Sequence, residues 1–381
     1  MTAHPIRIEG LHASTPGGRF RVEAVVDGHS VWFESQDAAL VPAPEAWASA
    51  FLIPSLYLHR PLEADPALDR LWASNVSLLA KRARRAWGYR QVRQDFSQSA
   101  VGAPVPAGRG SGLLFTGGVD SFHALLCSAE RPDVLINVHG FDVALADTAH
   151  HEAARRSIDA IAAETGKRTL YVRTNLREHP LILDTPWDAA HGGALAAVGH
   201  VLGGRLERVA ISSSQPRWSV NPWGSHWSTD PLWSSRTVEF VHLDPDIHRL
   251  DKVRRIAPHP LVHRHLRVCW HETGPRLNCS RCEKCMLTML CLAEAGHLAD
   301  CTVFEPVDLV AFVRSRRRSR WRLPILHLLA RSPRLDPELR RELRAMWWRS
   351  VLWRSTGIRW SVRIARRMLG LARPRAPGRT A

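Results

Sequence analysis

The sequence predicts an α/β protein built on a doubly wound parallel sheet, with an added metal site. Between about residues 111 and 254, short runs that are apolar throughout alternate with helical patterns. Such runs indicate strands buried on both faces, as in a parallel sheet that helices cover on both sides. A glycine turn, TGGVDS, joins the first of these strands to a helix, and four cysteines cluster further along the chain. We therefore expect a ligand site at the sheet and a separate metal-binding element.

Residues 1–100 are predicted to form a small β-rich accessory domain. Three runs suit strands, at residues 6–11, 19–26 and 29–35. The Asp27-Gly28 pair between the last two runs favours a hairpin. Residues 67–89 then show the apolar periodicity of an amphipathic helix. No chemical motif lies in this part, so it gives no indication of a function.

Residues 101–301 are predicted to form the main ligand-binding domain. The stretch 97–112, rich in Gly, Ala and Pro, is typical of a linker. Apolar runs then predict strands at 112–116, 134–141, 169–176, 208–214 and 237–243. Helical patterns separate most of these strands, at 121–129, 148–166 and 188–204. Ligands of such sheets bind at the carboxyl ends of the strands, which is where the glycine turn lies.

The glycine turn has the features of a phosphate-binding loop. Gly117 and Gly118 let the backbone approach a ligand, and the first amides of the following helix lack partners within that helix. Thr116 and Ser121 add hydroxyls, and Asp120 is placed to help hold Mg²⁺. The alternative is a tight bend that binds nothing, because Asp and Ser favour helix N-termini in any case. The turn matches neither the Walker A loop nor G-x-G-x-x-G, which disfavours a GTPase or a dinucleotide dehydrogenase.

The four clustered cysteines predict a metal site. Cys269, Cys279, Cys282 and Cys285 have the spacing C-x9-C-x2-C-x2-C. Four thiolates can surround one Zn²⁺ ion, and short C-x2-C turns place pairs of sulfurs on one side of the ion. An iron–sulfur cluster is the alternative, because it also takes four thiolates. A zinc site with four protein ligands would be structural, since it leaves no open position for a substrate.

These motifs together resemble a known family. TGGVDS resembles the S-G-G-x-D-S loop of the PP-loop ATP pyrophosphatase superfamily, with Thr116 in place of the usual serine. A PP-loop followed by such a cysteine site is similar to the 7-cyano-7-deazaguanine synthases. The segment RLDKVRRIA, residues 249–257, also resembles a D-K segment of that family. The resemblance covers roughly residues 111–295 and leaves out both ends of the chain. It therefore does not determine whether the substrate is that of the family.

The resemblance implies an ATP site and the residues that form it. The loop from Thr116 to Ser121 would hold the pyrophosphate of ATP, through Thr116, Gly117, Gly118, Val119, Asp120 and Ser121. Asp120, Ser121 and Lys252 would act in catalysis, with Asp120 supporting Mg²⁺ and Lys252 steadying phosphate or transition-state charge.

A tryptophan-rich loop over residues 215–235 follows the fourth predicted strand of the sheet. It contains Trp218, Trp223, Trp227 and Trp233, with Pro, Gly and Ser between them. Flat aromatic faces suit a planar heterocycle, so Trp218, Trp223 and Asp230 are the predicted substrate-binding residues. The alternative is a packed loop whose tryptophans fill a small core of their own. The loop also departs from the synthase pattern.

The C-terminal region, residues 302–381, is predicted to be helical and basic. From Arg314 to the end there are 20 arginines and three acidic residues, which accounts for the whole net charge of +16. Leu339, Leu343 and Met346 fall at helical spacing with arginines beside them. Such helices suit an anionic membrane surface, nucleic acid or an acidic protein. The alternative is a helix pair docked on the rest of the protein with its arginine face in solvent.

Taken together with the motifs, the resemblance implies an ATP-dependent ligase with ATP, Mg²⁺ and Zn²⁺ as cofactors. It would adenylate a carboxylate or carbonyl oxygen of a small or macromolecular substrate, release pyrophosphate and let a nitrogen nucleophile displace AMP. A tRNA sulfur transferase of the same superfamily and an ATP-binding scaffold that does not turn over are the alternatives. The N-terminus lacks the apolar run of a secretory signal, so we expect a cytoplasmic protein.

Overall fold

The chain divides into two compact units, residues 1–252 and 253–381. The computed structural model describes residues 4–65, 67–89, 92, 94, 96, 108–218, 223–269, 271, 276–316, 319 and 323–355. The two units do not coincide with the three ranges that the sequence suggested, 1–100, 101–301 and 302–381. Most of the expected linker, and the basic residues beyond 355, lie outside the described residues.

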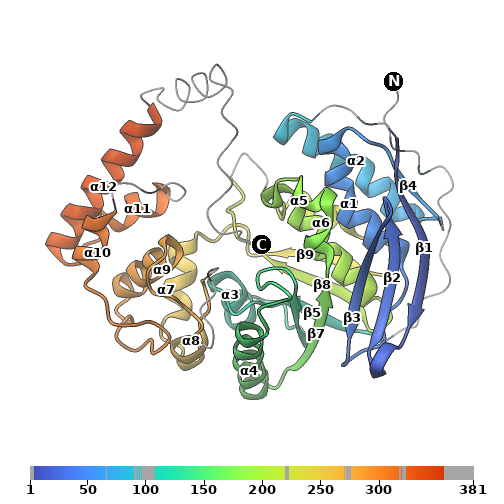
Figure 1. The fold of residues 1–381 in the computed structure, drawn as a ribbon. Coiled ribbons are helices and arrows are strands. Elements are labelled where there is room, and N and C mark those ends of the chain that lie inside the picture. Colours follow the sequence, from blue (N-terminus) through green and yellow to red (C-terminus); the bar gives the residue numbers. More distant parts are fainter. Residues whose placement is uncertain are drawn as a thin grey trace. The chain divides into compact units, whose positions relative to one another are not determined.

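The first unit is built on one nine-stranded, mostly parallel sheet, so the predicted α/β class is confirmed. Its strand order is β4-β1-β2-β3-β7-β6-β5-β8-β9 (Figure 1). The strands are β1 (Ile6–Ser14), β2 (Phe20–Val26), β3 (His29–Ser35), β4 (Leu62–Ala64), β5 (Gly110–Leu114), β6 (Val134–His139), β7 (Arg168–Thr174), β8 (Leu206–Ser212) and β9 (Glu239–Leu243).

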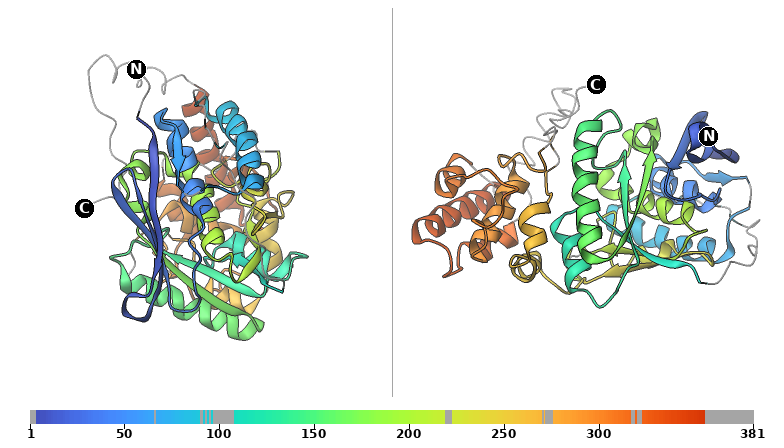
Figure 2. Two further views of the ribbon diagram at one scale, coloured as in Figure 1. Left: turned by 90° about the vertical axis from the view of Figure 1, so that its right-hand side faces the viewer. Right: turned by 90° about the horizontal axis from the view of Figure 1, so that it is seen from below.

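The order of the parallel strands reverses at the centre of the sheet. The chain starts at β5, moves outward through β6 to β7, and then returns to place β8 and β9 on the other side of β5. The views in Figures 1 and 2 show α3 (Val119–Cys127) and α4 (Thr148–Thr165) on one face, with α1 (Pro44–Leu58) and α6 (Trp187–Val201) on the other. The ends of β5 and β8 thus meet where the winding changes direction, which is where sheets of this kind bind ligands.

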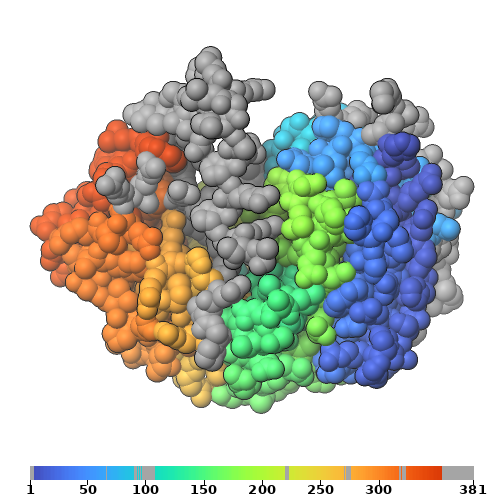
Figure 3. All heavy atoms as spheres, viewed as in Figure 1, coloured from blue at the N-terminus to red at the C-terminus, as the bar shows by residue number. Residues whose placement is uncertain are grey.

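The first hundred residues belong to this same sheet, which differs from the separate domain that we expected. Strand β3 pairs antiparallel with β7, through Phe33 opposite Thr174. Trp47 and Phe51 of α1 are fully buried in a core that also contains Val172 and Ala194. In Figure 3 the blue surface of the N-terminal strands meets the green surface of later residues without a break. The predicted strands and the helix α2 (Arg70–Trp87) are confirmed, and they share one core with the parallel strands.

Two glycines allow α6 to pack closely on its neighbours. A Cβ atom at Gly193 would lie 2.1 Å from the carbonyl oxygen of Ser49 in α1. A Cβ at Gly192 would lie 1.8 Å from the carbonyl oxygen of Gly224, in the tryptophan-rich loop. Glycine costs helix stability, but here any side chain would force the backbones apart. Helix α6 therefore packs directly against the backbone of α1 and against the backbone of the loop at Gly224.

The second unit is helical. It contains α8 (Pro260–His265), α9 (Glu283–Glu294), α10 (Leu309–Ser315), α11 (Leu323–Leu329) and α12 (Pro337–Ser355), whereas α7 (Arg249–Ile256) spans the division between the units. Helix α12 packs on α10 and α11 and buries Leu339, Leu343 and Met346. Helix α12 therefore uses this apolar face for packing within the second unit. None of the helices described is long and apolar enough to cross a membrane.

Candidate active site and metal centre

The glycine turn takes a conformation that glycine favours. Gly117 has φ +74° and is buried, while Thr116 before it is exposed. Gly118 is the N-cap residue of α3, and its carbonyl oxygen accepts hydrogen bonds from the Ser121 hydroxyl (3.0 Å) and the Phe122 amide (2.9 Å). The amides of the first turn of α3 precede this first helical hydrogen bond, and the positive end of the helix dipole lies at the turn.

Two cations converge on the carboxylate in the first turn of α3. Arg249 approaches one oxygen of Asp120 at 3.3 Å, and the Nζ of Lys252 approaches the other at 3.7 Å. Both cations come from α7, where a spacing of three residues places them on the same face. Lys252 was predicted from the sequence, whereas Arg249 was not. The i, i+3 pair in RLDK was the signal that could have found it.

Lys252 is held deep in the site. Its side chain is 3% exposed, and its Nζ donates a hydrogen bond to the carbonyl oxygen of Ser213 at 2.5 Å. Burial lowers the pKa of Lys252, whereas the carboxylates of Asp120 and Asp244 oppose that shift. Ser213 directly follows β8, so Lys252 of α7 connects the end of that strand to Asp120 in the first turn of α3.

Three further polar side chains at this end of the sheet were not found from the sequence. His123 of α3 is fully buried, and its Nδ1 lies 3.0 Å from a carboxylate oxygen of Asp244. Asp244 directly follows β9 and has φ +54°. Ser212, the last residue of β8, has a buried hydroxyl without a hydrogen-bond partner among the described residues. The carboxyl ends of β5, β8 and β9 thus each contribute polar groups to one region.

This arrangement can bind an anion. The N-terminal amides of a helix, a glycine with positive φ, and Arg and Lys side chains such as those of Arg249 and Lys252 are the groups that phosphates use in proteins. Asp120 balances only one of the two positive charges, and its side chain is 17% exposed. The predicted loop residues and Lys252 therefore lie together, at the point where the order of the parallel strands reverses.

The predicted substrate tryptophans lie in different settings. Trp218 is 66% exposed, and its ring is nearly parallel to that of His248, the residue before Arg249, with 6.5 Å between the ring centroids. Trp223 is partly buried, with its ring 6.1 Å from that of His191 of α6. Trp233 is fully buried in the core. Residues 219–222 of the loop lie outside the described residues.

Asp230, which was predicted to bind substrate, is enclosed by its own loop and by β9. Its side chain is fully buried, and its oxygens accept hydrogen bonds from the Ser225 hydroxyl (2.6 Å), the His226 amide (3.0 Å) and Nδ1 of His242 (2.6 Å). These three hydrogen bonds all join Asp230 to side-chain or backbone groups of the protein itself. In this arrangement Asp230 holds the second half of the tryptophan-rich loop against β9.

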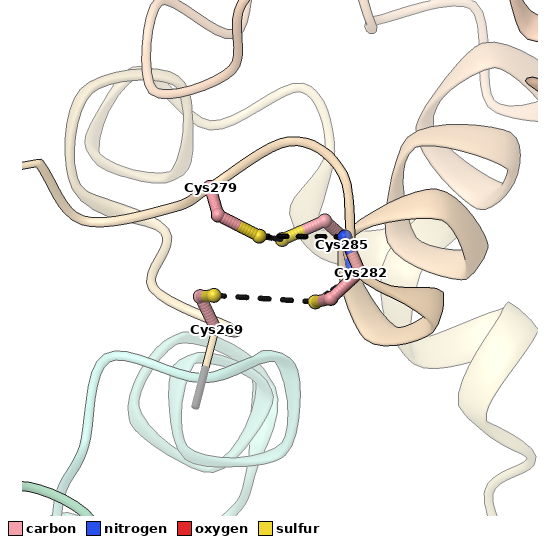
Figure 4. A group of neighbouring side chains, drawn as sticks. All are labelled: Cys269, Cys279, Cys282 and Cys285. Carbon is pink, nitrogen blue, oxygen red and sulfur yellow. Dashed lines mark hydrogen bonds between the residues drawn. The ribbon is translucent and has the colours of Figure 1, made fainter. Parts of the chain in front are cut away.

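The four predicted cysteines form a compact cluster in the second unit. The Sγ atoms of Cys269 and Cys282 are 3.9 Å apart, as are those of Cys279 and Cys285, and all four lie within 4.8 Å of one another (Figure 4). Tetrahedral coordination at a Zn–S distance of about 2.3 Å requires sulfurs about 3.8 Å apart. The cluster therefore fits one metal ion such as zinc.

Local backbone groups orient these sulfurs. The amides of Arg281 and Cys282 point at Cys279 Sγ (3.4 and 3.3 Å), and the Cys285 amide points at Cys282 Sγ (3.4 Å). Cys282 is the N-cap of α9, where the helix dipole favours a thiolate. Thiol hydrogen bonds with Cys269 and Cys282, together with burial, raise the pKa of Cys285. Four thiolates so close together therefore require a cation to balance their charge.

Comparison with known proteins found no match to any family model, curated protein or solved structure.

Proposed function

We propose that the protein binds ATP at the glycine turn and splits it between its α- and β-phosphates. An oxygen of a carboxylate or carbonyl substrate attacks the α-phosphorus, the bond to the bridging oxygen breaks, and pyrophosphate leaves. A nitrogen nucleophile then attacks the activated carbon, loses a proton and expels AMP. The convergence of Arg249 and Lys252 on the first turn of α3 carries this proposal.

Each residue of the site has a role in this scheme. Gly117, Gly118 and the first amides of α3 hold the pyrophosphate, and Thr116 and Ser121 add hydroxyls. Lys252 and Arg249 balance charge on the leaving pyrophosphate. Asp120 supports Mg²⁺, which ATP carries into such sites.

The proposed family rests on the sequence motif of the glycine turn and on the topology of the sheet together. A doubly wound sheet accounts for the order β7-β6-β5-β8-β9, and its first turn is the one that resembles the PP-loop. The cysteine cluster belongs to the same proposal as a structural zinc site, since four protein ligands leave no coordination position for chemistry. We assign the chain to an enzyme class similar to the 7-cyano-7-deazaguanine synthases.

The acceptor of the AMP group is best sought among planar compounds. The exposed ring of Trp218 lies beside His248, next to the proposed phosphate site, and offers a face for stacking. Trp223 is the second candidate for such a contact.

ATP–pyrophosphate exchange tests the proposal. The purified full-length chain with Mg²⁺ is incubated with labelled pyrophosphate, ATP and a panel of carboxylates that includes deazapurines and peptides. Label that enters ATP only when one of these acceptors is present supports adenylation. Absence of exchange with every acceptor, from protein whose cysteine site holds zinc, would count against it.

Sulfur transfer to tRNA is the second candidate, which the arginine-rich C-terminal region favours. It requires a cysteine near the ATP site that can carry sulfur. Cys127 is exposed, but it ends α3, and a nine-residue helix places it about 13 Å from the glycine turn. Cys127→Ala is therefore expected to leave activity unchanged. Loss of activity in this variant would favour sulfur transfer over ligation.

A scaffold that binds ATP without turnover is the third candidate. On α12, Trp348 is 52% exposed and Leu352 is 55% exposed, beside exposed arginines such as Arg344. This face suits an anionic partner: a membrane surface, nucleic acid or an acidic protein. The double variant Trp348→Ala, Leu352→Ala, which changes this exposed face and leaves the buried residues of α12 in place, separates the possibilities. Unchanged exchange with lost localisation assigns the region to tethering, whereas no exchange in either form favours the scaffold.

A further inference from the structure

A second group of metal-ligating side chains lies in the helical unit. One ligand atom from each of His263, His297 and Asp300 lies within 4.8 Å of the others. The two imidazole rings have centroids 5.9 Å apart and planes 23° apart, and His297 Nδ1 is 2.8 Å from a carboxylate oxygen of Asp300. These residues come from α8 and from the turn after α9, so the fold brings together positions that are more than thirty residues apart in the chain.

The tautomer of His263 is fixed by a backbone carbonyl. Its Nε2 lies 2.6 Å from the carbonyl oxygen of Ala257, and an oxygen acceptor requires Nε2 to carry the proton and donate. The lone pair that a metal needs is then on Nδ1. Ligating histidines in metalloproteins usually donate their other ring N–H in this way, which fixes the ring and makes it a better ligand.

The backbone around His297 is also held in place. The amide of Gly296 donates to Ala293, and the His297 amide donates to Leu292, as in a Schellman motif, with Gly296 at φ +83°. The carbonyl oxygen of His297 accepts a hydrogen bond from the Cys301 thiol at 3.3 Å. The turn that carries His297 and Asp300 is therefore fixed from both sides before any ion binds.

The turn is connected to α8 as well. The Thr302 hydroxyl donates to the carbonyl oxygen of His263 at 3.3 Å. Asp300 is about half exposed and His297 about a third, so an ion can reach the group from solvent. Proximity, a fixed tautomer, a fixed backbone and access are thus all present.

We propose that His263, His297 and Asp300 form a second metal site, for a divalent first-row transition ion such as Zn²⁺. Two imidazoles and one carboxylate select this class of ion over Mg²⁺ or Ca²⁺, which take oxygen ligands. Three protein ligands leave at least one coordination position for water or an exogenous ligand, unlike the closed cysteine site. The ion would join α8 to the turn after α9 and stabilise the helical unit, because only the folded chain presents the three ligands together.

Metal counting tests this site, with Zn²⁺ as the probe. The full-length chain without a histidine tag is dialysed against buffered Zn²⁺, and bound zinc is measured per chain. We expect His297→Ala and Asp300→Asn each to hold one equivalent fewer than the wild type. His12→Ala, which removes an exposed histidine of β1, is the matched control and should hold as much zinc as the wild type.

Retention of the cysteine-bound equivalent shows that a variant is folded. If His297→Ala loses both equivalents, the conservative variant Asp300→Asn decides, because its side chain is exposed and keeps its size. In titrations, we expect either variant to weaken binding of the second equivalent by about a hundredfold or more, since even partners that only orient ligands contribute tenfold to a hundredfold. Wild-type zinc content in both variants, or a single equivalent in the wild type, would overturn the proposal.

Discussion

The glycine-turn site and the cysteine cluster are assembled in different ways. All four cysteines lie between residues 269 and 285, and three of them lie within seven residues. The glycine-turn site draws its groups from the ends of three strands and from α7, over residues 116–252. A site with its ligands in one short segment can be found from spacing alone. A site assembled by the fold can be found only in part.

The two sites also differ in what completes them. The sulfur distances fit one ion, so the cysteine cluster needs only its metal. At the glycine turn, two cations converge on a single carboxylate at the N-terminus of α3, and an anionic ligand would balance the remaining charge. Loss of the metal should therefore affect folding, whereas loss of a cation should affect binding and chemistry.

Removal of the cysteine-bound metal is expected to have the largest effect. In Cys282→Ser, we expect the helical unit to lose its protection from hydrogen exchange, because structural zinc sites contribute about 10–16 kcal/mol of apparent binding energy. Hydrogen exchange read by mass spectrometry, with zinc content measured in parallel, would check this for each unit separately. Cys127→Ser, which changes an exposed cysteine of α3, should leave both units protected. Wild-type protection of α9 in Cys282→Ser would contradict a structural role for the metal.

Loss of Lys252 is expected to affect chemistry and leave the fold in place. We expect Lys252→Ala to slow ATP–pyrophosphate exchange by about 100- to 1,000-fold, the usual loss when one group that stabilises developing charge is removed. Lys81→Ala provides the control, since Lys81 is exposed on α2. Equal exchange rates in the two variants would show that Lys252 has no part in the reaction.

Acid is expected to destabilise the two units for different reasons. In the first unit, a buried histidine is responsible. Burial lowers the pKa of His200 to about 3, although its Nε2 is 3.1 Å from the carbonyl oxygen of Trp233. The unfolded chain takes up this proton below a pKa of about 6.5 and the folded chain does not. The contribution of neutral His200 to the free energy of unfolding is therefore fully present above pH 6.5. It falls by about 1.4 kcal/mol per pH unit toward pH 3, which is a loss of about 2 kcal/mol by pH 5.

The variant His200→Gln keeps a donor near Trp233 and removes the titration. Hydrogen exchange of α6 between pH 7 and pH 5 should then depend less on pH than in the wild type. The acid response of the helical unit, which follows protonation of the cysteine ligands, should not change. An unaltered pH dependence of α6 would assign its acid sensitivity to other groups.

The smallest of these effects is expected at the glycine turn itself. Gly117→Ala places a side chain at φ +74°, which costs about 1–2 kcal/mol of stability. Gly166→Ala, at φ +65° in the C-cap of α4, should cost a similar amount far from the site. Thermal unfolding should thus shift alike in both, whereas only Gly117→Ala should weaken ATP binding. Equal ATP affinity in the two variants would contradict a phosphate-binding role for the turn.

Much of the fold followed from the sequence because the elements have clear periodicities. The predicted strands and helices of the parallel region occur at the expected positions, and so does α2. Helix α1 was missed because its residues are apolar on every face and include Pro54, a pattern that does not distinguish a buried helix from a strand. Its burial between the N-terminal strands and α6 explains that composition.

The shared sheet could not be predicted, because strand pairing between distant segments leaves little mark on sequence. Only two residue pairs join β3 to β7, and both strands have the composition of ordinary strands. The same holds for individual side chains at the site. The His123–Asp244 pair depends on how β9 meets α3, which no local pattern encodes. The spacing of Arg249 and Lys252 places both on one face of α7, but the sequence does not show that this face meets Asp120.

Calorimetric titration of the wild type and Lys252→Ala with MgATP, magnesium pyrophosphate and AMP tests the central claim most directly. If the turn holds the pyrophosphate of ATP, pyrophosphate should bind the wild type and compete with ATP. The variant should then lose about a hundredfold or more in affinity for both ligands while its affinity for AMP stays the same. No binding of ATP or pyrophosphate to the wild type, or equal affinities in the variant, would contradict the claim.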